Sequence, residues 1–244
     1  MAGTCLLEVA ANSVTSALTA QEGGAGRVEL CTALELGGVT PSFAQIAMAR
    51  EHLSIPLYVL IRPRGGDFVY SDRECELMLR DIETCVELGC DGVVLGVLDA
   101  EGKVDMVRCR ELVAAARGLG VTFHRAFDVS LDPLQTLEDV IALGCERVLT
   151  SGTRDSAVDG ASLIHTLIAQ AAGRLTVMPG AGITAQNIAG LAQATGAREF
   201  HASAKHSLPS RMQQHRQALS GLDGSELCTD LVQVREIVAA LRGC

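Results

Sequence analysis

Short apolar runs alternate along this chain with longer segments in which apolar residues recur every three to four positions. The short runs are typical of buried strands, and the longer segments are typical of amphipathic helices. The expected strands cover residues 6–10, 27–31, 56–61, 92–96, 121–124, 147–151, 175–178 and 198–203. The expected helices cover residues 13–23, 42–52, 71–88, 105–119, 133–143, 157–172, 184–194 and 230–241.

This alternation predicts the fold class, because strands that alternate with helices form parallel sheets. Eight strand–helix units in 244 residues match a single closed (β/α)8 barrel, the TIM barrel. An open, doubly wound sheet is the alternative. No linker divides the chain, so we expect one domain over residues 1–244, with a long polar loop at about residues 204–228 before the last helix.

The fifth predicted strand runs directly into His124, Arg125 and Asp128. In a (β/α)8 barrel the ligand site lies at the carboxyl ends of the strands, where these side chains would stand. Glu8, Glu29 and His124 are therefore candidates for proton transfer, with Asp128 orienting an imidazole. The structural alternative is that His124 and Asp128 satisfy each other while Arg125 faces solvent.

Anion-binding groups follow two other predicted strands. Gly180 and Gly182 precede a predicted helix, whose free backbone N–H groups would bind phosphate, unless these glycines only permit a tight turn. Arg62 and Arg64 flank a proline and could clamp a carboxylate or phosphate, unless they only form salt bridges with residues such as Asp67. The expected ligand-binding residues are Arg62, Arg64, Asp67, Arg125, Ser151, Gly180, Gly182, His201 and Ser203.

Strand alternation also directs charged side chains into the barrel interior, among them Arg27, Glu29, Glu199 and His201. A structural interpretation is that Arg27, Glu29 and Glu199 form buried ion pairs that fix the strand register. Metal-ligand spacing offers little guidance, because the chain has no His-x-His or Cys-x-x-Cys pair. Soft donors such as Cys31 would favour Cu(I) if the fold brought them together.

Composition narrows the classes of partner. A net charge of −9 and a pI near 5.1 argue against nucleic acid and anionic membrane surfaces as partners. No apolar run is long enough to span a bilayer, and no secretory signal is apparent. The nine cysteines form no disulfide-like framework, so we expect a reducing compartment with mostly buried, free thiols.

Several motifs resemble those of a known family, the CutC copper homeostasis proteins, in a form closer to its animal than its bacterial members. The resemblance covers nearly the whole chain and weakens after about Ser207. It is carried by Arg27-Val28-Glu29-Leu30-Cys31, Arg62-Pro63-Arg64-Gly65-Gly66-Asp67-Phe68, Thr122-Phe123-His124-Arg125-Ala126-Phe127-Asp128, Arg147-Val148-Leu149-Thr150-Ser151-Gly152 and Met178-Pro179-Gly180-Ala181-Gly182.

The resemblance implies a (β/α)8 barrel, homo-oligomers, a cytoplasmic and also nuclear location, and Cu(I) as the ligand. Animal members are proposed to bind Cu(I) through two cysteines, of which one corresponds to Cys31. The other falls at Ala10 in this chain. The resemblance therefore implies a copper homeostasis protein with Cys31 as its metal ligand.

The residues also support a reading from a different class, an enzyme that acts on a small phosphorylated or carboxylated substrate. An isomerase, epimerase or lyase fits better than a Schiff-base aldolase, because the sixth predicted strand ends in Thr150 and Ser151 rather than lysine. A barrel that serves only as an interaction scaffold is the third reading.

Overall fold

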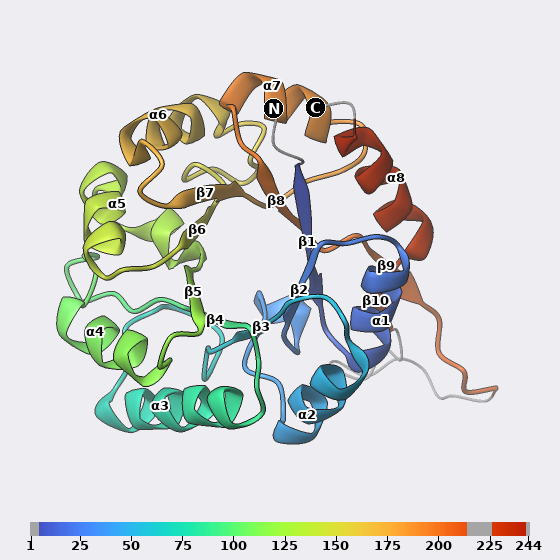
Figure 1. Cartoon of the computed structure of the whole chain (residues 1–244), viewed down its shortest axis with the longest axis horizontal. Helices are drawn as coiled ribbons and strands as arrows, with labels where there is room; N and C mark the ends of the chain where they lie inside the picture. The colour runs from blue at the N-terminus through green and yellow to red at the C-terminus, as the bar shows by residue number, and fades with distance from the viewer. Residues whose placement is uncertain (1–4, 214–225, 243–244) are drawn as a thin grey trace.

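The central sheet of this protein is a ring of eight parallel strands surrounded by helices (Figure 1). The computed structural model describes residues 5–213 and 226–242. The strands follow the order β7-β6-β5-β4-β3-β2-β1-β8, and a parallel bridge between Gly180 and His201 joins the two edge strands. The predicted (β/α)8 barrel is therefore confirmed, and the alternative of an open sheet is wrong.

Seven of the eight helices follow a barrel strand directly, and the eighth follows a short hairpin. The strands are β1 Leu6–Ala11, β2 Arg27–Leu30, β3 Leu57–Leu60, β4 Gly92–Leu95, β5 Gly120–Phe123, β6 Arg147–Thr150, β7 Thr176–Pro179, β8 Glu199–Ala202, β9 Lys205–Leu208 and β10 Glu226–Thr229. The helices are α1 Val14–Glu22, α2 Phe43–His52, α3 Asp72–Glu87, α4 Met106–Ala115, α5 Pro133–Ala142, α6 Ala161–Ala171, α7 Ile188–Thr195 and α8 Leu231–Leu241. Two short 3-10 helices are η1 Leu34–Leu36 and η2 Arg125–Val129.

Two helices begin about four residues later than the sequence predicts. Before α6 the chain folds back on itself, and a β-carbon on Gly160 would collide with the backbone of Ser151. Before α7 the side chain of Asn187 donates to the Gly182 carbonyl oxygen and accepts from the Thr184 amide, which closes a turn. The Asn187 side-chain bonds compete with the first turn of a helix, so α7 starts only after this turn.

The main hydrophobic core fills the space between the strands and the helices. Outward-facing strand residues such as Val9, Val28 and Val59 are fully buried there. The lumen of the barrel is different, because many charged side chains lie there beside a small apolar cluster that includes Tyr58 and Leu60. This division agrees with the predicted alternation of strand side chains.

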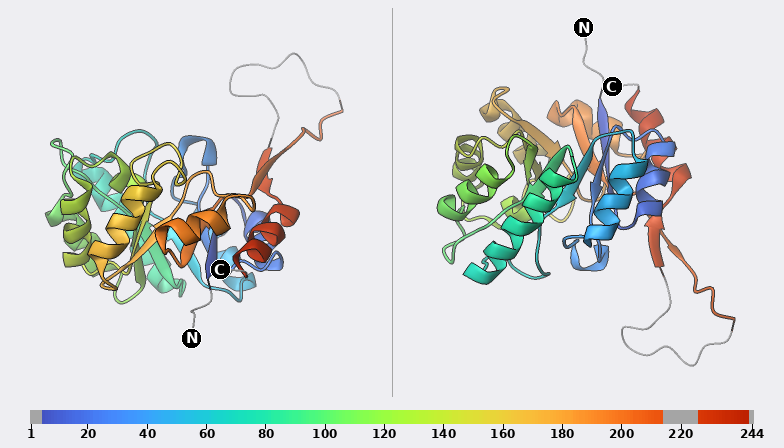
Figure 2. Two further views of the ribbon diagram at one scale, coloured as in Figure 1. Left: turned by 90° about the horizontal axis from the view of Figure 1, so that it is seen from above. Right: turned by 60° about the horizontal axis from the view of Figure 1, so that its bottom comes forward.

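The segment expected as a loop at residues 204–228 carries a strand at each end. Strands β9 and β10 pair antiparallel, with Lys205 opposite Thr229 and Leu208 opposite Glu226. This hairpin projects from the barrel at the end opposite the start of β1 (Figure 2). Residues 214–225 lie outside the described part of the chain. No helix among the described residues is long and apolar enough to cross a membrane.

Candidate functional site

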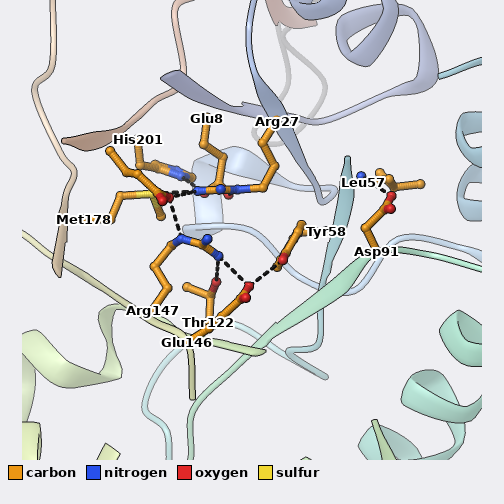
Figure 3. A network of polar contacts seen from close by, with 11 residues as sticks. Glu8, Arg27, Leu57, Tyr58, Asp91, Thr122, Glu146, Arg147, Met178 and His201 are labelled. Carbon is orange, nitrogen blue, oxygen red and sulfur yellow. Dashed lines mark hydrogen bonds and ion pairs between the residues drawn. The ribbon is translucent and has the colours of Figure 1, made fainter. Parts of the chain in front are cut away.

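A chain of largely buried ion pairs runs through the lumen of the barrel (Figure 3). Arg147 on β6 donates to Glu199 on β8 at 2.7 Å and to Glu146 at 2.8 Å. Arg27 on β2 donates to the same Glu199 oxygen at 2.7 Å and pairs with Glu8 on β1. The buried ion pairs considered for Arg27 and Glu199 are therefore present, and they link strands on several sides of the barrel.

At one end of this chain of contacts, beyond Arg27, three ionisable residues form a cluster: Glu8, Glu29 and His201. The Nδ1–H of His201 donates to Glu8 at 2.7 Å. One ligand atom from each of the three residues lies within 4.8 Å of the other two. The Oε2 atom of Glu29 is buried and has no hydrogen-bond partner among the described residues. This arrangement of an imidazole and two carboxylates is able to hold a metal ion.

The two carboxylates of the cluster have opposite electrostatic environments. Burial alone would raise the pKa of Glu8, but Arg27 and His201 outweigh it and lower the pKa to about 2. Burial raises the pKa of Glu29 to about 7, with a further contribution from the negative charge of Glu8. Despite burial, Glu29 and Glu8 raise the pKa of His201. Glu8 is thus an anion at neutral pH, whereas Glu29 is poised to exchange a proton.

A pocket of about 310 Å³ lies beside this cluster, at the end of the barrel where the strands have their carboxyl ends. We call this end the mouth of the barrel and this cavity the mouth pocket. Its lining combines ionisable side chains with an apolar wall. The lining residues are Ala10, Glu29, Leu34, Leu36, Gly37, Leu60, Arg62, Phe68, His124, Arg125, Asp128, Val129, Leu149 and His201. A larger cavity of about 590 Å³ lies beside α7 at the other end of β1, but Arg198 is the one charged residue in its lining. The mouth pocket is therefore the better candidate site.

His124 lines the pocket and has one ring nitrogen without a hydrogen-bond partner among the described residues. Its Nδ1 atom accepts from the Ala126 amide at 3.2 Å, so a neutral ring carries its proton on Nε2. The Nε2 atom is buried and unpartnered within the described chain. Burial and the nearby charge of Arg62 lower the pKa of His124 to about 3. His124 is therefore a neutral hydrogen-bond donor at physiological pH, not a ready proton acceptor.

Arg62 is held by backbone carbonyl groups rather than by a carboxylate. Its guanidinium donates to the carbonyl oxygens of Leu36 and Gly38, each at 2.8 Å, and of Gly66 at 2.9 Å. The same group stacks over the Phe68 ring, with 5.0 Å between Cζ and the ring centroid. Its Nε–H group has no partner in the described structure. Arg62 thus brings to the pocket lining a positive charge that no carboxylate of the described chain neutralises, and this charge also acts on the buried Tyr70 hydroxyl.

Asp128 does not orient His124, contrary to the sequence-based hypothesis. Its carboxylate accepts from the Thr150 hydroxyl and the Ser151 amide and forms an ion pair with Arg125. Asp128 thereby ties η2 to the end of β6. Arg125 also donates to the Ser151 hydroxyl at 2.9 Å, so Ser151 serves this junction beside the pocket.

Arg64 and Asp67 form an ion pair with each other on the outside of the loop after β3. Arg64 also pairs with Glu74 in the first turn of α3. This matches the structural alternative, a turn held by salt bridges, and neither residue lines the pocket. Arg62 and Arg64 therefore do not form the expected clamp.

Three further residues that were expected to bind a ligand do not line the mouth pocket either: Gly180, Gly182 and Ser203. The Gly180 amide donates to the Thr150 carbonyl oxygen, so it is already used within the sheet. A β-carbon on Gly180 would lie 2.5 Å from Cδ1 of Leu149 and 3.3 Å from Cβ of His201, so this glycine makes room for both side chains. The carbonyl of Gly182 accepts from Asn187, and Ser203 lies beyond the end of β8.

Cys31, the expected copper ligand, is buried with 1% exposure in the apolar cluster of the lumen beside Tyr58, Leu60 and Val94. Burial, and to a lesser extent the charges of Glu29 and Glu35, raise the pKa of its thiol. Cys31 is therefore a protonated thiol near the carboxylate cluster, and it is not one of the three clustered ligands.

Phe68 is a pocket residue that the sequence-based predictions did not include. Its ring lies 5.0 Å from the ring of His124 and under the guanidinium of Arg62, so it connects the two donors. Leu149 and Val129 complete the apolar wall. Apolar residues after a strand have no local signal that separates a pocket wall from ordinary core, so only the fold identifies them.

Comparisons with known proteins agree with this architecture. The sequence model of the CutC family matches residues 5–206. A CutC family protein of Xylella fastidiosa is 62% identical over 235 residues, which cover 96% of this chain and 88% of the relative. A mouse relative named copper homeostasis protein cutC homolog is 48% identical over 240 residues, with the same coverage of 96% and 88%. The bacterial relative is thus the more similar of the two, although an animal form was expected.

A solved structure gives the same result at the level of the fold. A copper homeostasis protein CutC from Streptococcus agalactiae superimposes with a TM-score of 0.79 at 36% identity. The match covers 82% of this chain and 98% of that protein. Sequence, fold and relatives agree, and the chain belongs to the CutC family.

Proposed function

We propose that this protein takes part in copper homeostasis by binding a copper ion at Glu8, Glu29 and His201. The names of the mouse and streptococcal relatives support the copper role. The observation that carries the proposal is geometric: one ligand atom from each residue lies within 4.8 Å of the others, at three adjacent strands. The Oε2 atom of Glu29 has no hydrogen-bond partner among the described residues, so it is available to bind a metal ion.

The hydrogen bond that joins His201 Nδ1 to Glu8 marks where a metal ion could bind. A metal ion held by Nδ1 and Glu8 would replace the proton that now lies between them, so metal binding would release a proton. Imidazole and carboxylate ligands suit Cu(II), whereas Cu(I) favours thiolates and thioethers. The proposed site therefore predicts a preference for Cu(II) over Cu(I).

The Cu(I) site at Cys31 that the resemblance implies is a second form of this proposal. Its support is the soft sulfur donor close to Glu29. The buried thiol must lose its proton to bind, and the raised pKa opposes that loss. The second family cysteine is replaced by Ala10. We therefore give the carboxylate and histidine cluster precedence.

A copper competition titration against chromogenic chelators tests both forms. Cu(II) is titrated under air and Cu(I) under anaerobic reducing conditions, for wild type, His201→Gln and Cys31→Ser. Cys5→Ser is the control, because Cys5 precedes β1 at the other end of the barrel. We expect wild type to bind Cu(II). The affinity of His201→Gln for Cu(II) should be lower by a factor of about ten or more. A loss confined to Cys31→Ser would assign Cu(I) to that thiol, and a wild type that cannot compete would refute copper binding.

We also propose that this protein is located in the cytoplasm and the nucleus, and that it forms homo-oligomers. These proposals rest on the family resemblance alone. Imaging of a fluorescent fusion tests the location, and analytical ultracentrifugation of the purified protein tests the assembly. A sedimentation coefficient of a 25.6 kDa monomer across the accessible concentration range would contradict the oligomer.

The mouth pocket favours a second function, an isomerase, epimerase or lyase acting on a small phosphorylated or carboxylated substrate. The specific observation is that three buried polar atoms without partners belong to its lining residues: Glu29 Oε2, Arg62 Nε and His124 Nε2. A carboxyl group with a pKa of about 7 can accept and return a proton at neutral pH. Hydrogen–deuterium exchange into candidate substrates tests this, since Glu29→Gln should abolish the exchange without abolishing binding.

A further inference from the structure

Arg62 differs from the other buried arginines of the barrel in lacking an ionic partner. Arg27 and Arg147 are both paired with Glu199. Arg62 is only 6% exposed, yet no ion pair joins it to a carboxylate in the part of the chain that the structure describes. A buried charge without a counter-ion is costly, so an anion in the adjoining pocket would be favourable there.

The His124 side chain supplies a second donor with a fixed orientation. The bond from the Ala126 amide determines its tautomer, and the Nε2–H group is left unpartnered. The ring packs against Phe68, and a β-carbon on Gly96 would lie 2.6 Å from its Nδ1 atom. The ring is therefore held in place before any ligand arrives.

The pocket favours a carboxylate over a phosphate. Its volume of about 310 Å³ suits a small metabolite, and the apolar wall leaves few donors besides those of the charged residues. The backbone features that bind phosphate in many barrels are engaged elsewhere. The Gly180 amide donates to Thr150, and α7 begins only at Ile188, six residues beyond Gly182.

We propose that Arg62 and His124 form a binding site for a small organic carboxylate, whose oxygens accept from Arg62 Nε–H and His124 Nε2–H. Glu29 and His201 line the same pocket and face the bound molecule. This inference deepens the second proposed function and rests on it, because it names the substrate class of that site. It does not depend on copper.

Two variants of His124 separate its two ring nitrogens. Asparagine places its side-chain oxygen near the Nδ1 position, so His124→Asn keeps an acceptor for the Ala126 amide but loses the outer donor. Glutamine places its amide nitrogen near the Nε2 position, so His124→Gln keeps that donor. Arg174→Gln is the control, because Arg174 pairs with Glu138 on the outside of the barrel.

The test is calorimetric titration and thermal shift with formate, acetate, glycolate and pyruvate, and separately with inorganic phosphate. We expect at least one carboxylate to bind wild type, His124→Gln and Arg174→Gln with similar affinity. His124→Asn should bind it about tenfold to hundredfold more weakly, since a hydrogen bond to a charged ligand is lost. The melting temperature of each variant without ligand reports whether the fold is intact.

The outcomes distinguish the inference from the function on which it rests. Stabilisation by phosphate without any carboxylate would overturn the carboxylate site and leave a small-anion enzyme standing. No stabilisation by any of these anions would overturn both. Equal carboxylate binding by His124→Asn and wild type would overturn the role of His124.

Discussion

At the scale of single residues, two neighbouring carboxylates of the site behave in opposite ways. Arg27 and His201 keep Glu8 ionised, whereas Glu29 lacks such a partner and its pKa rises to about 7. Carboxyl groups whose environments push their pKa values apart mark the acid and base positions of many active sites. Glu29 is therefore the residue on which proton transfer or metal binding would depend.

Replacing Glu29 by glutamine should change how stability depends on pH. The folded-state pKa of about 7 lies above the ordinary value of 4.5, so Glu29 destabilises the fold as the pH rises through this interval. Below about pH 4.5 the carboxyl is neutral in both states and the effect vanishes. We expect Glu29→Gln to be more stable than wild type by a few kcal/mol above about pH 7.

Thermal denaturation of both proteins across this pH range checks the expectation. Glu236→Gln supplies the control, because it makes the same substitution at an exposed position on α8. A constant difference between Glu29→Gln and wild type would show that Glu29 titrates normally.

At the scale of elements, the ends of helices position the pocket residues. The loop between β3 and α3 carries Arg62 and Phe68, and it is anchored where α3 begins. Ser71 and Glu74 form a capping box at that point, and Glu74 also pairs with Arg64. The cap therefore stabilises both the helix and the loop that borders the pocket.

Removing the Ser71 hydroxyl should weaken this anchor. We expect Ser71→Ala to lower the free energy of unfolding by about 1 kcal/mol, because the first turn of α3 loses an acceptor. Urea denaturation measures the change. Ser162→Ala is the matched control, since exposed Ser162 lies in the first turn of α6 and provides no cap there. Equal stability of Ser71→Ala and wild type would contradict this role of the cap.

At the scale of the whole molecule, the buried network joins strands that are distant in the sequence. A single Glu199 oxygen accepts from Arg27 and Arg147, on strands β2 and β6. Because the network is largely buried, salt screens it less than it screens surface pairs. These contacts select one strand register and leave the cluster at the mouth in a defined position.

Breaking this network should destabilise the barrel strongly. We expect Glu199→Gln to lower the free energy of unfolding by about 3–5 kcal/mol, because two buried arginines lose their shared anion. Glu138→Gln breaks a solvent-screened surface pair with Arg174 and should lower the free energy of unfolding far less. Denaturation at low and high salt distinguishes the two. If both variants lost an equally small, salt-sensitive amount of unfolding free energy, this would contradict a structural role for the network.

Local sequence patterns determined the barrel class and the side of each strand that faces the lumen. Side chains alternate with a period of two along a strand, so Glu29 and His201 could be assigned inward without knowledge of their neighbours. The eight repeated units identified the fold, and the motif residues identified the family.

Only the tertiary structure decided which of these side chains meet. Glu8 and His201 are 193 residues apart and touch because the barrel closes between β1 and β8. Arg62 lies at the pocket, whereas Arg64 lies on the outer surface. Asp128 accepts hydrogen bonds from the end of β6 and not from His124. Such pairings depend on closure of the sheet and on loop geometry. Local periodicity therefore carries no information about them.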